Sequence, residues 1–84
     1  MTKYAQAILS FLNKYYETTS FEENNKVKIS ELLDNINKFY HYSGYQICNY
    51  WCLVEDIKSS TKYAEVIITD DYIFGLKLRE TPLQ

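Results

Sequence analysis

The residues best suited to chemistry lie in one stretch, residues 37–52, NKFYHYSGYQICNYWC. It holds His41, Cys48 and Cys52, which are the only histidine and the only two cysteines of the chain. Zinc sites normally use four protein ligands, and this stretch offers three. On a strand, the two cysteines would lie roughly 13 Å apart at about 3.3 Å per residue, too far for a disulfide. We therefore interpret them as small buried hydrophobic residues and expect no metal and no other cofactor.

The sequence carries no sign that His41 and either cysteine form an activated catalytic pair. His41 could act as a base for either thiol, but no Lys or Arg occurs from residue 39 to 57. Without a neighbouring cation, and in an apolar setting, a thiol pKa is raised rather than lowered. The chain also contains no GxSxG, HExxH or phosphate-loop pattern. These observations predict a protein that is not an enzyme.

Composition limits the size of the fold and the kind of partner. The chain has 84 residues, 46% apolar and 24% charged, which is typical of one small folded domain, here residues 1–84. Its net charge of −2 repels phosphate, so nucleic acid and anionic membranes are disfavoured as direct partners. No apolar run approaches the roughly 20 residues of a membrane span, and the N-terminus lacks the pattern of a signal peptide. We expect a cytoplasmic protein.

Helical periodicity predicts two amphipathic helices. The first covers residues 3–17, where apolar residues recur at the i, i+4, i+7, i+11 spacing (Tyr4, Ile8, Phe11, Tyr15). The second covers residues 30–41, with Ser30 as the expected N-cap and Glu31 in the first turn.

Residues 45–57, YQICNYWCLVEDI, are compatible with a strand or a helix. Their nearly continuous run of aromatic, β-branched and Cys residues favours a central strand. Ile47, Trp51, Val54 and Ile57 would share one face if the segment were helical. We favour the strand and keep the helix as the alternative.

Two further strands are expected at residues 63–69 and 72–79, because apolar residues alternate along both on even-numbered positions. Paired residues must lie on the same face of a sheet, so their numbers should have an even sum. This predicts a three-residue loop at 69–71 that pairs Ile68 with Tyr72. Asp71 would then adopt the left-handed conformation that Asp tolerates.

These elements predict an α+β fold in which two helices pack on one face of a three-stranded antiparallel β-meander. The expected core comprises Ile8, Phe11, Leu12, Leu32, Leu33, Ile36, Phe39, Ile47, Trp51, Val66, Ile68, Phe74, Leu76 and Leu78.

The helical alternative gives a different order of elements. With residues 44–57 helical, the chain reads helix, strand, helix, helix, strand, strand, which resembles a winged helix-turn-helix DNA-binding regulator. The resemblance implies that residues 44–57 form the recognition helix, with Gln46 and Asn49 facing the bases, and that residues 69–71 form the wing tip. The charges oppose this function, because the helix would lack cations and the wing tip carries two Asp.

Protein recognition is the function that the surface residues favour. The chain has nine tyrosines, and aromatic residues are enriched at protein interfaces. We expect the protein-binding residues to be Tyr42, Tyr45, Tyr50, Tyr63, Asp70 and Asp71. In general character the chain resembles the small inhibitors that phages and mobile elements encode against host enzymes, including anti-CRISPR proteins. The resemblance implies stoichiometric binding to a host protein, such as a basic nucleic-acid-handling enzyme. An exposed sheet edge would also permit a homodimer.

Overall fold

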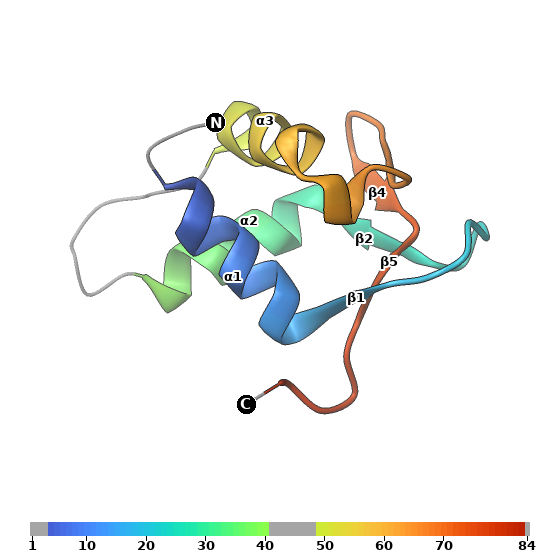
Figure 1. Cartoon of the computed structure of the whole chain (residues 1–84), viewed down its shortest axis with the longest axis horizontal. Coiled ribbons are helices and arrows are strands. Elements are labelled where there is room, and N and C mark those ends of the chain that lie inside the picture. The colour runs from blue at the N-terminus through green and yellow to red at the C-terminus, as the bar shows by residue number, and fades with distance from the viewer. Residues whose placement is uncertain (1–3, 41–48, 84) are drawn as a thin grey trace.

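The described helices gather at one end of the molecule and the strands at the other, as Figure 1 shows. The structure is a computed structural model that describes residues 4–40 and 49–83. Its helices are α1 (Ala5–Tyr15), α2 (Ile29–Phe39) and α3 (Tyr50–Ser59), and a short 3-10 helix, η2 (Thr61–Tyr63), follows α3. No helix in the described part of the chain is long and apolar enough to cross a membrane.

Helices α1 and α2 form where the periodicity predicts them. α1 buries Ile8 and Leu12, and α2 buries Leu32 and Ile36, so each contributes one apolar stripe to the core. The predicted N-cap at Ser30 is wrong, because α2 already begins at Ile29, directly after a strand, and no side chain caps it.

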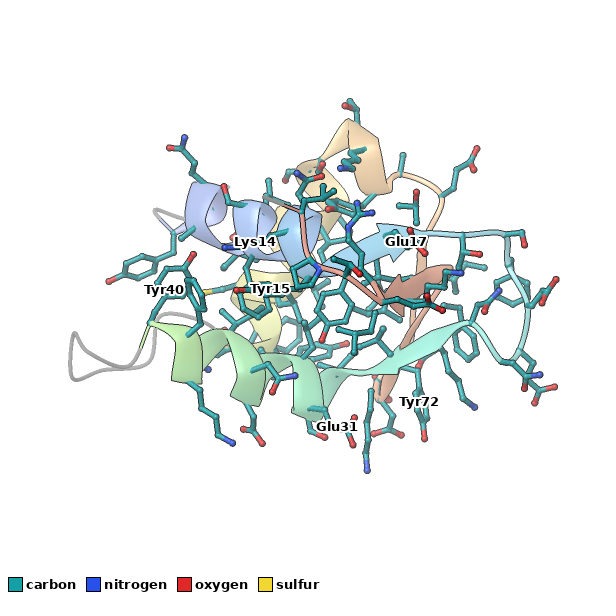
Figure 2. All side chains as sticks on the ribbon, turned by 90° about the horizontal axis from the view of Figure 1, so that it is seen from below. Lys14, Tyr15, Glu17, Glu31, Tyr40 and Tyr72 are labelled. Carbon is teal, nitrogen blue, oxygen red and sulfur yellow. The ribbon has the colours of Figure 1, made fainter. Side chains whose placement is uncertain are left out.

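Aromatic rings pack between α1 and the C-terminal end of α2. The ring of Phe11 lies 4.7 Å from that of Tyr15 and 5.5 Å from that of Phe39, measured between centroids. The hydroxyl of Tyr40 donates a hydrogen bond of 3.1 Å to the Ala7 carbonyl, which ties the end of α2 to α1. Tyr15 and Tyr40 are labelled in Figure 2. Phe39 packs among these rings but remains 46% exposed, so the prediction that it belongs to the core is wrong.

The preference for a strand in residues 45–57 is wrong from Tyr50 onward, because these residues form α3. The Asn49 side chain caps the helix by accepting a hydrogen bond of 2.9 Å from the Cys52 backbone N–H. Leu53, Val54 and Ile57 turn toward the core, at a spacing that only a helix places on one face. Residues 45–48, including Gln46 and Ile47, lie outside the described residues.

Five short strands form two antiparallel sheets. β2 (Lys26–Lys28), β4 (Tyr72–Phe74) and β3 (Ile67–Ile68) form a three-stranded sheet in that spatial order, and β1 (Tyr16–Thr18) pairs with β5 (Leu76–Leu78). The α+β class is therefore confirmed. The predicted meander is wrong, since the third strand of the sheet is β2, which pairs with β4 rather than with β3, and the spatial order is not sequential.

Gly75 divides the predicted strand at 72–79 into β4 and β5. Its φ of +87° lies in the left-handed region, which other residues rarely adopt. Its N–H donates to the Asn25 carbonyl at 2.8 Å, and its carbonyl accepts from the Thr19 N–H at 3.0 Å. The chain therefore leaves one sheet at Phe74 and enters the other at Leu76.

The hairpin between β3 and β4 uses a register that the parity argument rejected. Ile68 pairs with Ile73, and the Thr69 N–H donates to the Tyr72 carbonyl at 2.8 Å, so Asp70 and Asp71 alone form the turn. No described residue other than glycine has a positive φ, so Asp71 is not left-handed. Ile73, an odd-numbered residue, faces the core with 0% exposure, so the side of β4 that is buried is not the even-numbered one that the prediction assumed.

Apart from β1 and β5, which pair with each other in a separate sheet, and the short η2, the elements follow the order α1, β2, α2, α3, β3, β4 that the winged-helix resemblance implied. The described core comprises mainly Ile8, Leu12, Leu32, Ile36, Leu53, Ile57, Ile73 and Leu76. Leu33, Val66, Ile68 and Phe74 are only half-buried. Leu78 and Trp51 were expected in the core and are exposed instead.

Candidate functional site

Trp51 is the outstanding feature of the described surface. It is the only tryptophan of the chain, and 77% of it is exposed, more than any other large hydrophobic residue in the described ranges. It lies on the outward face of α3 together with Glu55 and Lys58, at the i, i+4, i+7 spacing of one helix face. We call this set the α3 face.

The backbone under Trp51 is held firmly. α3 is capped by Asn49 at its first turn and anchored to the core by Leu53 and Ile57. The ring of Tyr50 meets that of Trp51 edge-on, with centroids 5.2 Å apart and planes at 86°. Tyr50 itself is half-buried and packs against the core. Trp51 is therefore presented from a rigid support, which reduces the entropy lost on binding.

The charges of the α3 face are mixed. Glu55 and Lys58 are both exposed and contribute one negative and one positive charge. Asp56 is fully buried on the other side of the helix, where it has an interaction partner. A face with one cation offers little attraction to the phosphates of DNA, which supply most of the affinity of DNA-binding helices.

The described residues bring together no metal site. They contain no group of three or more His, Cys, Asp or Glu residues arranged to hold an ion. Cys52 is a half-buried free thiol that packs against the core, whereas His41 and Cys48 lie outside the described residues.

The structure separates the residues that sequence reasoning grouped as a protein-binding site. Tyr50 lies beside Trp51 at the start of α3. Asp70 and Asp71 are exposed at the turn between β3 and β4, a different element. Tyr42 and Tyr45 lie outside the described residues.

Tyr63 is buried rather than exposed. Only 3% of it is accessible, and its hydroxyl finds no hydrogen-bond partner among the described residues. Burial raises the pKa of Tyr63, and the positive charge of Arg79 lowers it by a smaller amount. Its selection as a binding residue is therefore wrong, because the residue belongs to the core.

Sequence reasoning missed Trp51 because it placed this residue on a face with Val54 and Ile57. An alternative face was present in the sequence, since Tyr50, Leu53, Val54 and Ile57 follow the i, i+3, i+4, i+7 pattern. That choice leaves Trp51 off the buried face, about 100° around the helix from Tyr50.

The α3 face can insert one large aromatic ring into an apolar recess of another protein. Tryptophan is among the residues most enriched at the energetic centres of protein interfaces, where its area is fully desolvated. A comparison with protein-family models, curated proteins and solved structures finds no significant match for this chain.

Proposed function

We propose that this chain is a small non-enzymatic protein-binding module whose α3 face docks on a partner protein. The observation that carries the proposal is the 77% exposure of Trp51 on a helix that is capped and anchored to the core. Leaving such a ring in water sacrifices the favourable free energy of burying a large apolar side chain. A partner that covers Trp51 recovers this free energy.

The partner that we propose is a host enzyme with a basic surface, which the chain inhibits by stoichiometric binding inside the bacterial cell. Small size and a net charge of −2 support this anti-defence type of function. The negative charge speeds the encounter with a basic surface, and Trp51 then supplies the short-range contact.

A winged-helix DNA-binding regulator is the second candidate, because the order of elements favours it. In that function α3 would enter the major groove and the β3–β4 turn would contact the backbone. The α3 face carries Trp51 and Glu55 beside the single cation Lys58, and the turn carries two Asp. Both surfaces suit a protein partner better than a phosphate backbone.

The test begins with capture from a bacterial host lysate, using the tagged chain and its Trp51→Ala variant, with and without nuclease. Phe21→Ala is the matched control, since Phe21 is 60% exposed but belongs to a different surface. The captured protein is then purified and titrated with each chain. We expect Trp51→Ala to weaken the purified complex by roughly 30-fold or more, as a hot-spot residue does, and Phe21→Ala to leave it unchanged.

Two results would contradict the proposal. Equal binding by wild type and Trp51→Ala would show that the α3 face is not the docking surface. DNA in the eluate, with loss of every captured protein after nuclease treatment, would favour the regulator.

A further inference from the structure

The three-stranded sheet has a second surface on the side away from the core. Val27, Ile73 and Ile68 are paired across the strands on the core side. Their neighbours point the other way and, with a loop residue that packs on them, form what we call the open sheet face: Phe21, Lys26, Lys28, Ile67, Tyr72 and Phe74. Figure 2 shows Tyr72 on the side of the molecule away from α1.

The middle of the open sheet face is aromatic. Ring centroids of Tyr72 and Phe74 on the central strand are 6.2 Å apart, and Phe21 lies 5.6 Å from Phe74. The ammonium group of Lys26 lies 4.5 Å from the centre of the Tyr72 ring. Ile67 is 49% exposed beside Phe74. These contacts make an apolar strip along β4.

Opposite charges border the two sides of this strip. Lys26 and Lys28 lie on β2, paired with Phe74 and Tyr72. On the other side, β3 is preceded by Glu65 and followed by Asp70, both exposed. Within the described ranges, Lys28, Glu65 and Asp70 have no ion-pair partner.

The pairing register also places one lysine and one carboxylate at each end of the sheet. Lys28 and Asp70 both lie at the Tyr72 end of the sheet. Lys26 and Glu65 both lie at the Phe74 end, because Ile67 pairs with Phe74. The open sheet face therefore has a positive side, an apolar middle and a negative side. Each end of the face carries one lysine and one carboxylate.

From this arrangement we infer that the open sheet face binds a second copy of the chain, giving a symmetric dimer. A two-fold axis parallel to β4 lays the β2 side of one copy over the β3 side of the other. Lys28 then faces Asp70 of the second copy, and Lys26 faces the end where Glu65 lies. The aromatic strips of the two copies pack against each other, as in an isologous interface between two sheets.

Single-stranded nucleic acid is the competing occupant, because aromatic rings and lysines on a sheet can bind stacked bases. Glu65, Asp70 and the neighbouring Asp71 border the same strip and repel a phosphate backbone. In the dimer Glu65 and Asp70 face lysines of the other copy, so these two charges become favourable. The open sheet face therefore fits a copy of itself better.

The test exploits the symmetry through two charge reversals, Lys28→Glu and Asp70→Lys, followed by sedimentation velocity at low ionic strength. The wild type is expected to show twice the 10.0 kDa chain mass at high concentration. Each variant alone creates two like-charge contacts and should weaken dimerisation roughly tenfold or more. An equimolar mixture of the two variants should recover the dimer, because every contact in the mixed pair joins opposite charges.

Lys58→Glu is the control, since it makes the same charge change on the α3 face and should leave the mass unchanged. Circular dichroism of each variant verifies the fold, and recovery in the mixture shows directly that both variants are competent. A wild type that stays monomeric at all concentrations overturns the inference. So does a dimer that both reversals leave intact, or a monomer that binds a labelled single-stranded oligonucleotide through Tyr72.

This inference goes beyond the proposed function and can fail independently of it. The dimer uses the open sheet face, whereas the partner uses the α3 face. Trp51→Ala should therefore leave the dimer mass unchanged, and the charge reversals should leave partner binding through Trp51 intact.

Discussion

Helix α3 and the three-stranded sheet differ in how their aromatic residues outside the core are packed. Each has one side in the core and another side, facing away from the core, that carries aromatic rings. On α3 the ring of Trp51 contacts that of Tyr50, and 77% of the residue is exposed. On the sheet, Tyr72 and Phe74 contact each other, Phe21 and Lys26. The rings on the sheet therefore stabilise the fold by packing against one another, whereas the Trp51 ring contributes little to stability.

This difference separates residues that serve stability from residues that serve binding. A half-buried aromatic residue that contacts several neighbours contributes to both, so its removal gives an ambiguous result. An exposed aromatic residue with few contacts contributes mainly to binding. Trp51 is therefore the cleaner probe of function, and the open sheet face requires charge reversals rather than truncations.

The core sides of the two regions should behave alike and give the largest effects. Ile73 on β4 and Leu53 on α3 are both fully buried. Replacing either with Ala removes buried methyl and methylene groups and leaves a cavity, which should lower the free energy of unfolding by about 2–5 kcal/mol. Chemical denaturation measures this directly. A cost below about 1 kcal/mol at Ile73 alone would mean that the sheet is only loosely attached to the helices.

On the sides that face away from the core, replacement of an aromatic residue with Ala should cost different amounts of stability in the two regions. Tyr72→Ala removes the contacts with Phe74 and Lys26 and should cost about 1 kcal/mol of stability. Trp51→Ala should change stability by less than about 0.5 kcal/mol, as is usual for an exposed side chain. Both values come from denaturation of the isolated chain at a concentration where it is monomeric. Equal losses at the two positions would remove the distinction between the regions.

A change in the opposite direction is expected at the junction between them, where η2 connects α3 to the sheet. The buried Tyr63 hydroxyl finds no hydrogen-bond partner among the described residues, so Tyr63→Phe should be neutral or stabilise by up to about 1 kcal/mol at neutral pH. Tyr40→Phe is the matched control, because that hydroxyl does donate a hydrogen bond, and its loss should cost about 1 kcal/mol.

The pH dependence sharpens this last prediction. Burial raises the pKa of Tyr63 above its ordinary value of 10.0, so the folded chain keeps the phenolic proton to higher pH than the unfolded chain does. The stability linked to this group is complete below that ordinary value and is lost as pH rises through the folded-state pKa. The stability advantage of Tyr63→Phe over wild type should therefore grow above pH 10. An advantage that stays constant with pH would show that the hydroxyl is not desolvated.

Local pattern predicted some elements well and failed at others. α1 and α2 were predicted because their apolar stripes have only one helical face that can be buried. The segment from Tyr50 to Ile57 is apolar on nearly every side, so both periodicities fit it and the wrong one was favoured. In the structure this segment is a helix that is capped by the Asn49 side chain, which accepts from the Cys52 N–H, and that packs Leu53 and Ile57 into the core.

The sequence by itself determined the two amphipathic helices, the α+β class, the negative charge and the presence of more aromatic residues than a small core can hold. Only the tertiary structure decided which of them are buried. The left-handed conformation of Gly75 split one strand, Ile73 rather than its neighbours turned inward, and Tyr63 entered the core while Trp51 stayed in water. The physical reason is that burial depends on what packs opposite a residue, and alternation along a short strand or helix is compatible with either face.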